Sequence, residues 1–326
     1  MSSAATPAAE SGTTGGRHPI HDDASTWPEI NCYVDLWIEL LHSRGYDPLL
    51  ACGFVFDSDL DGRQWSFHKY DLEDLLLIYG VRVVELNVWR SLSWHIREQL
   101  AAGRLLTVEV DAFHLPDTYG VSYQLHHVKT TVAVDAFDPD GPSVGYFHNR
   151  GRYETSGADT VALLRLDREA PEALAPYVET ISFDHAGAAA ATEDAALERA
   201  RVHVRRRAVG NPVTKLGDRL RADVDWLVEE TARDEQACYD YAFGTVRQCG
   251  AGAQIAARYV EALGRIDGAG APEAVAAFDR VATTAKSLQF ILTRRAHGRR
   301  GDLDGPLATM TDDWATAMAA VVERYG

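Results

Sequence analysis

The chain has 326 residues, of which 46% are hydrophobic and 25% charged, as in an ordinary globular protein long enough to bury a core. Its 48 acidic and 32 basic residues give a formal charge of −16. This charge argues against a nucleic-acid-binding protein and against attachment to an anionic membrane surface, because both need a basic footprint.

The N-terminal segment, residues 1–26, is rich in Ala, Ser, Thr and Gly and is expected to be a disordered tail with no signal peptide. No apolar run approaches the ~20 residues that a membrane helix needs. The four cysteines show neither the spacing of a zinc site nor that of a disulfide scaffold. We therefore expect a cytoplasmic protein that uses no metal and no cofactor.

The first half of the chain is rich in aromatic and β-branched residues, and its hydrophobic pattern predicts mixed elements. An amphipathic helix is expected over "CYVDLWIELLHSRG", from Cys32 to the Gly45 that ends it. A buried strand over residues 49–56, a short helix capped by Asp71 and a strand within "VRVVELNV" follow. A further helix is expected over "SLSWHIREQLAAGR" and a strand over "LLTVEVDAF".

The strongest β signal consists of "HHVKTTVAVDAF", the turn "DPDGPS" and "VGYFHN", which together predict an antiparallel hairpin. Periodicity is lost over residues 183–191, and the chain then becomes rich in Ala, Arg, Glu and Asp. The remainder predicts helices only, over residues 193–207, 215–247, 252–263, 272–296 and 312–324. The expected fold is α+β, with a first domain over residues 27–185 and a mainly helical domain over 186–326.

Cys32 opens the first predicted helix, and this position gives the first indication of chemistry. A helix N-terminus carries roughly half a positive charge and unpaired N–H groups, which favour a thiolate and can bind an oxyanion. Cys52, Cys238 and Cys249 lie inside predicted elements and are expected to be buried structural thiols. By position alone, a packed core thiol is the commoner interpretation of Cys32 as well.

The predicted hairpin supplies a candidate base and a candidate orienting group. His126 and His127 are consecutive, so they face opposite sides of a strand, and the apolar pattern does not choose between them. If the turn is centred near residues 138–139, Asn149 lies across from His127. Asp135 is about 26 Å away along the same strand and is excluded. Cys, His and Asn in this chain order form the papain-type arrangement.

Two further residues are candidates for substrate binding. Asp111 ends the strand before the hairpin and could line the site or contact an amine, or it could only cap a turn. The sequence leaves open whether Asn149 or Asp111 is the third catalytic member. Lys129 shares the face of His127 and could bind substrate, although a solvated strand residue is the commoner role for such a lysine.

Five segments carry a resemblance: "NCYVDLWIELLHSRGYDPLLACGF", "LNVWRSL", "VEVDAFHLPDTYG", "HHVKTTVAVDAFD" and "GYFHNRGRYE". Together they resemble a bacterial family of biosynthetic-cluster proteins that are encoded beside stand-alone aminoacyl carrier-protein ligases. The resemblance covers residues 28–165, with a looser helical match beyond. The N-terminal half also resembles, more distantly, the papain-like fold of butirosin biosynthesis protein H. That protein is a papain-like acyltransferase that moves an aminoacyl group from an acyl carrier protein to an amine. The resemblance implies a papain-like first domain with Cys32 as nucleophile and His127 as base. The third member falls on Asn149, where the related pattern more often has Asp followed by Pro.

The function that this resemblance implies is acyl or aminoacyl transfer. A carrier-protein thioester would donate the acyl group to Cys32, and a small-molecule amine would accept it. The alternatives are a cysteine peptidase or amidase with water as acceptor, and a non-catalytic scaffold of the same fold. Because a carrier protein is typically acidic, docking would need a local basic patch, although a solvated helix face is the commoner role of such a cluster. The candidates are Arg199, Arg201, Arg205, Arg206 and Arg207, and Arg294, Arg295, Arg299 and Arg300.

Overall fold

The computed structural model of the chain describes residues 16–167, 175–183 and 188–326. The chain divides into two compact units. Unit 1 comprises residues 1–22, 31–48 and 75–190, and unit 2 comprises residues 23–30, 49–74 and 191–326. The residues expected to form one domain over 27–185 are therefore shared between the two units.

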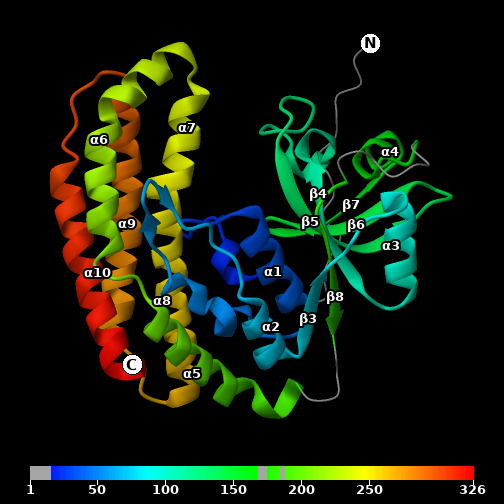
Figure 1. Cartoon of the computed structure of the whole chain (residues 1–326), viewed down its shortest axis with the longest axis horizontal. Helices are drawn as coiled ribbons and strands as arrows, with labels where there is room; N and C mark the ends of the chain where they lie inside the picture. The colour runs from blue at the N-terminus through cyan, green and yellow to red at the C-terminus, as the bar shows by residue number, and fades with distance from the viewer. Residues whose placement is uncertain (1–15, 168–174, 184–187) are drawn as a thin grey trace. The chain divides into compact units, whose positions relative to one another are not determined.

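Unit 1 is built on an antiparallel sheet that follows a helix in the chain. Among the described residues, the sheet has six strands in the order β3-β8-β4-β5-β6-β7 (Figure 1). These strands are β3 (Val81–Glu85), β4 (Leu105–Asp111), β5 (Lys129–Asp138), β6 (Ser143–His148), β7 (Gly151–Ser156) and β8 (Val178–Phe183). The predicted hairpin is confirmed as β5 and β6, whose β-branched and aromatic residues suit a pleated surface. Strands β7 and β8 were not predicted.

Helices cover both faces of this sheet. Apolar side chains of β4 and β5, among them Val108 and Val132, form a core with two of the helices. The opposite face carries the paired residues Thr107 and Ala133, and it packs against the first long helix. The helices are α3 (Leu92–Ala101) and α4 (Ala158–Leu164) on the apolar face and α1 (Cys32–Ser43) on the other.

Helix α1 begins and ends close to the predicted positions. The side-chain oxygen of Asn31 caps its N-terminus by accepting hydrogen bonds from the N–H groups of Tyr33 and Val34, at 3.1 and 2.9 Å. The Tyr33 hydroxyl donates to Glu179 of β8 at 2.9 Å, whereas Tyr46, just beyond the helix, stacks on Phe183 at the other end of β8. Because β8 is antiparallel to β4, α1 starts on the side of the sheet where β4 ends.

The apolar run over residues 49–56 forms a 3-10 helix, η2 (Pro48–Val55), and the strand predicted there is wrong. All of its residues are buried, so the run has no polar face whose period could distinguish a strand from a helix. Cys52 lies within it and is fully buried, as predicted. The next helix, α2 (Leu72–Tyr79), has the predicted cap, because the carboxylate of Asp71 accepts the Glu73 N–H at 2.8 Å.

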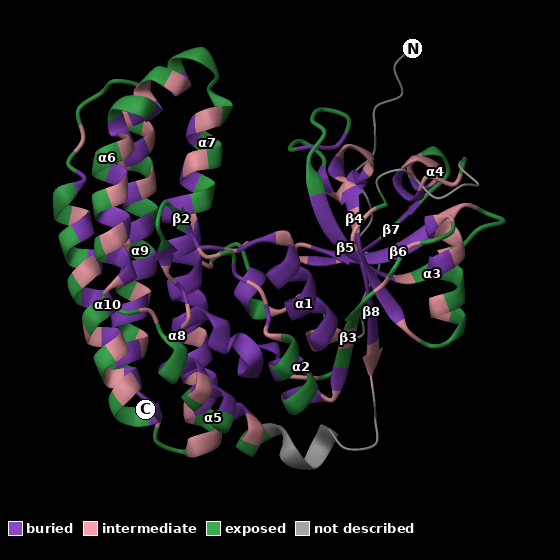
Figure 2. Ribbon diagram, viewed as in Figure 1, coloured by how far each residue is buried: buried purple, intermediate pink, exposed green. Residues whose placement is uncertain are grey.

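Unit 2 is mainly helical, as the sequence predicted. Helix α8 lies at its centre and is buried along most of its length, as Figure 2 shows. The helix predicted over residues 215–247 is divided, because the backbone leaves helical geometry at Asp234. No helix within the described residues is both long and apolar enough to span a membrane. The elements are β1 (Leu60–Asp61), β2 (Gln64–Trp65), α5 (Ala188–Arg206), α6 (Pro212–Arg233), α7 (Gln236–Ala242), a π-helical turn (Phe243–Arg247), α8 (Gln248–Asp267), α9 (Pro272–Ala296) and α10 (Asp304–Tyr325).

Aromatic side chains join two early segments of the chain to the C-terminal helices of unit 2. The indole N–H of Trp27 donates to the carbonyl oxygen of Ala282 at 3.0 Å, and its backbone N–H donates to Gln254 at 2.8 Å. The ring of Phe56 packs on that of Tyr259, with centroids 5.2 Å apart. These contacts explain why residues 23–30 and 49–74 pack with the C-terminal helices.

The described part of the predicted tail is ordered, so the prediction of disorder over residues 1–26 is wrong for this part, while residues 1–15 lie outside the described residues. His21 ends a short 3-10 helix and is completely buried. Its Nδ1 lies 2.6 Å from Glu39 and its Nε2 lies 3.3 Å from Asp35, and both carboxylates are buried on α1. The polar composition of the segment hides this buried ion cluster.

This cluster predicts a pH-dependent stability. Burial by itself would lower the pKa of His21, but hydrogen bonds and charge from Asp35 and Glu39 raise it from 6.5 to about 9. Protonated His21 therefore stabilises the fold fully below pH 6.5, and this contribution is lost as the pH rises through 9. We expect His21→Gln to lower the free energy of unfolding by about 3 kcal/mol at pH 6 and by much less at pH 10. Urea denaturation at the two pH values measures this, and an equal effect at both would contradict the prediction.

Candidate functional site

The residues predicted to carry chemistry are brought together, in part, where β4 ends and β5 begins. The register pairs Asp111 with Lys129, and His127 lies two residues before Lys129, just outside the strand. The Nδ1 atom of His127 lies 2.6 Å from a carboxylate oxygen of Asp111. The structure therefore joins His127 to Asp111, a residue that the sequence suggested as a substrate contact, as a turn cap or, in place of Asn149, as the third catalytic member.

Two residues, Asp111 and Phe113, fix the orientation of the His127 ring. The second carboxylate oxygen of Asp111 accepts the Phe113 N–H at 3.0 Å, which holds the carboxylate in place. The ring of Phe113 stacks on the imidazole, with centroids 4.3 Å apart and planes inclined by 12°. Partial burial would raise the pKa of Asp111, but the hydrogen bonds from His127 and Phe113 hold it below its usual value. An ionised Asp111 therefore favours the proton on Nδ1 and leaves Nε2 for a substrate.

The His127 side chain is 71% exposed and lines a shallow cavity of about 290 Å³. Its Nε2 makes no hydrogen bond with a described residue, so a ligand can reach this atom. Lys129 lines the same cavity, where its ammonium group lies 2.7 Å from Glu109. The lining residues are Glu109, Val110, Asp111, His127, Val128, Lys129, Arg165 and Pro176.

Cys32 is partly exposed and is the first residue of α1. Helix α1 packs against β5, β6 and β7. Tyr33, near its start, shares the carboxylate of Glu179 with Thr107, which lies on the same face of β4 as Glu109 and Asp111. Cys32 and the His127–Asp111 pair thus belong to one face and one end of the sheet. No hydrogen bond joins the Cys32 thiol to a described residue, His127 included.

The N-terminus of α1 offers fewer free donors than the sequence suggested. The N–H groups of Tyr33 and Val34 already donate to the side chain of Asn31. The backbone N–H of Cys32 makes no hydrogen bond with a described residue, and it is the donor closest to an acyl group on the sulfur. An oxyanion formed there would therefore be bound by the Cys32 N–H rather than by the next two N–H groups.

Asn149 does not lie across from His127, and the predicted pairing is wrong. The register places Phe147 opposite Ala133, and β6 ends at His148. Asn149 follows in the tight turn to β7, with a φ of 44°. The turn of the hairpin is centred about two residues later than expected, which shifts every cross-strand neighbour.

A second histidine–aspartate pair lies inside unit 1. His148 Nδ1 is 2.6 Å from Asp117, and its Nε2 is 2.8 Å from the hydroxyl of Thr130. The Tyr146 hydroxyl donates to the other oxygen of Asp117 at 2.7 Å. His148 and Asp117 are almost fully buried, and both ring nitrogens are used, so this network fixes the core rather than offering a reactive group.

One group of described residues in unit 2 has the donor types of a metal site. Single ligand atoms of Asp71, Asp74 and His203 lie within 4.8 Å of one another. However, Arg199 donates to Asp71, Glu73 and Asp74, and both nitrogens of His203 are paired with carboxylates. The buried guanidinium already supplies the positive charge here, so this cluster is better explained as a structural ion network.

The two arginine clusters differ in how far they remain available to a partner. In the first, Arg199 is buried and Arg206 pairs with Asp71, so these two residues do not form an open basic patch. In the second, Arg294, Arg299 and Arg300 are exposed at the end of α9 and beyond it, and they form no ion pair with a described residue.

Comparison with known families gives a match over almost the whole chain. Residues 16–183 match the DUF1839 N-terminal domain, and residues 189–323 match the DUF1839 C-terminal domain. No curated protein matches the chain.

Proposed function

The chain belongs to the DUF1839 family, and we propose that it is a cysteine-dependent acyl- or aminoacyltransferase with a papain-like unit 1. The observation that carries the proposal is the 2.6 Å contact between His127 and Asp111 at the end of the sheet face covered by α1, the helix that Cys32 begins. In this proposal Cys32 is the nucleophile, His127 the base and Asp111, in place of Asn149, the orienting residue.

The reaction would run in two steps that share one covalent intermediate. In the first, the Cys32 sulfur attacks the carbonyl carbon of a carrier-protein thioester, and the bond to the phosphopantetheine sulfur breaks. His127 Nε2 takes the thiol proton of Cys32 and returns it to the departing thiol. One thioester replaces another, so this step is nearly isoenergetic and draws on no ATP.

In the second step, an amine acceptor attacks the Cys32 thioester. His127 Nε2 takes a proton from the attacking nitrogen, the carbon–sulfur bond breaks, and His127 returns the proton to the Cys32 sulfur as the amide leaves. Glu109 lines the cavity beside His127 and could receive a protonated amine before it reacts. The kinship with butirosin biosynthesis protein H, a carrier-protein partner and a cytoplasmic location form part of the same proposal.

The proposal is tested by the fate of an acyl group. The protein is incubated with acyl and aminoacyl carrier-protein thioesters and examined by intact-mass spectrometry, with and without small amines. We expect an acyl adduct that accumulates without amine and disappears as an amide forms when amine is added. Rapid hydrolysis without amine would instead indicate an amidase or peptidase. A folded protein that gives no adduct with any thioester or peptide would indicate a scaffold.

A further inference from the structure

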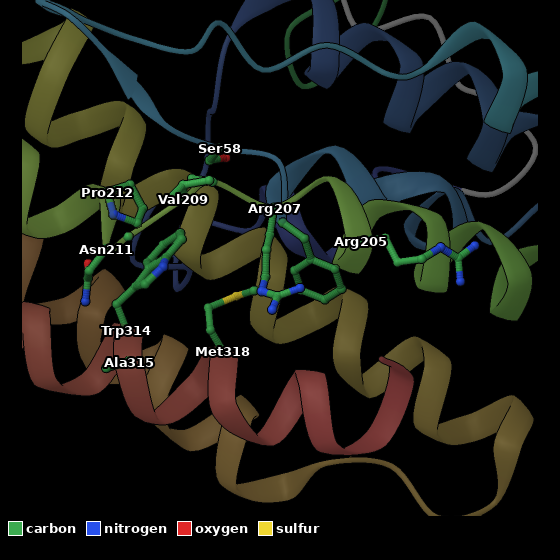
Figure 3. A pocket seen from close by; sticks show the side chains of 12 residues that line it. Ser58, Arg205, Arg207, Val209, Asn211, Pro212, Trp314, Ala315 and Met318 are labelled. Carbon is green, nitrogen blue, oxygen red and sulfur yellow. The ribbon is translucent and has the colours of Figure 1, made fainter.

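A second cavity, of about 560 Å³, lies entirely within unit 2 (Figure 3). It lies between the segment that joins α5 to α6 and one face of α10. Val209 and Pro212 line it on the first side, and Trp314, Ala315 and Met318 line it on the second (Figure 3). Its volume falls in the range of about 300–1,000 Å³ that is typical of small-molecule sites.

The floor of this cavity is apolar and well packed. The side chains of Phe56 and Trp314 are 1% and 4% exposed, so both rings are held firmly in the core and only a small part of their surface reaches the cavity. Trp314 is held by edge contacts with Phe278 and Trp65, whose ring centroids lie 5.5 and 6.4 Å away. Met318 adds a flexible thioether that adapts to the shape of a bound group. This floor suits an aromatic ring or a short acyl chain.

Two charged residues are among the described residues that line the cavity, and both are cationic. Arg205 and Arg207 line the cavity, and no carboxylate does. Arg205 pairs with Glu198 at 3.3 Å, so Arg207 is the lining cation that forms no ion pair with a described residue. Arg207 lies beside Met318, whereas Arg205 points away from the other labelled side chains (Figure 3). One Nη atom of the exposed Arg207 donates to the carbonyl oxygen of Val204 at 2.7 Å, and its other N–H donors remain for a ligand.

We propose that this cavity binds a small organic carboxylate with an apolar body. The carboxylate would accept hydrogen bonds from Arg207, and the ring or acyl chain would lie over Trp314 and Met318. A single guanidinium matches a carboxylate in its fork geometry. The lining residues belong to unit 2, whereas Cys32 and His127 belong to unit 1, and the proposal does not depend on the function proposed for those two residues.

The test compares 4-phenylbutyrate with its neutral amide, 4-phenylbutyramide, by isothermal titration calorimetry at low salt. We expect the carboxylate to bind the wild-type protein about tenfold more tightly than the amide, because only the carboxylate forms charge-assisted hydrogen bonds. Arg207→Gln should weaken carboxylate binding to the level of the amide. Arg201→Gln is the matched control, because it removes the same charge from an exposed residue of α5 that does not line the cavity. It should leave both affinities unchanged.

A second variant tests the position of the site by filling it. Ala315 is exposed on α10 and lines the cavity, so Ala315→Phe adds bulk without disturbing the core. This variant should lose binding of both compounds and keep the far-ultraviolet circular dichroism of the wild type. Equal binding of carboxylate and amide, equal effects of Arg207→Gln and Arg201→Gln, or wild-type binding by Ala315→Phe would each overturn the proposal.

Discussion

Replacing Cys32 with Ala should abolish the acyl adduct completely, because the adduct requires a sulfur atom that can attack and then leave. Of the four cysteines, Cys32 alone is partly exposed, while Cys52, Cys238 and Cys249 are buried. Burial also raises the pKa of the Cys238 and Cys249 thiols, which disfavours the reactive thiolate. The measurement is intact mass after incubation with an acyl carrier-protein thioester.

Alkylation gives the control for this experiment. In the folded wild-type protein, iodoacetamide should modify Cys32 first, and the singly alkylated protein should form no adduct. Tryptic mapping identifies the modified residue. If Cys32→Ala still formed the adduct at the wild-type level, the covalent mechanism at Cys32 would be wrong, whatever the role of His127.

Local sequence signals were sufficient to predict helix α1 and the residue at which it begins. Asn31 is a strong N-cap residue, and the apolar residues that follow have the helical period, so the position of Cys32 at the helix start could be predicted. The helices of unit 2 were predicted for the same reason, and α9 has the expected bounds. Each of these features depends on residues that are close in the sequence.

The neighbours of His127 could not be predicted from such local signals. A register shift between Val134 and Ala136, and a turn later than expected, changed all pairings of the β5–β6 hairpin. Moreover, the partner of His127 comes from β4, which precedes it by 16 residues. Pairing β4 with β5 would have placed Asp111 opposite Lys129 and close to His127, but nothing in the local pattern indicates which strand lies on the other edge of β5.

The division of the chain into units depended on contacts of still longer range. Trp27 donates to a carbonyl 255 residues away, and His203 pairs with Asp57 and Asp74 across 146 and 129 residues. Side chains such as these choose their partners by shape and charge in the folded protein. Composition therefore located the change from sheet to helices but did not reveal that residues 23–30 and 49–74 belong to unit 2.

The variant Asp111→Asn tests whether Asp111 is the residue that orients His127 in the proposed site. The amide keeps the size of the side chain but removes the carboxylate that orients the His127 ring, and it can present N–H rather than oxygen to Nδ1. Loss of one positioned acid–base contribution lowers a rate by on the order of a hundredfold. We therefore expect the single-turnover rate of acyl transfer from Cys32 to an amine to fall by about that factor in Asp111→Asn.

The matched variant is Asn149→Gly. Asn149 has a φ of 44°, a conformation that Gly adopts without strain, so this change removes the amide side chain and preserves the turn. Its rate of acyl transfer should stay close to that of the wild type. A large loss in Asn149→Gly together with an unchanged rate in Asp111→Asn would restore Asn149 as the third member. Asp111 contacts the imidazole in the folded protein, whereas Asn149 lies in the turn beyond β6. The geometry therefore favours a loss of rate in Asp111→Asn and not in Asn149→Gly.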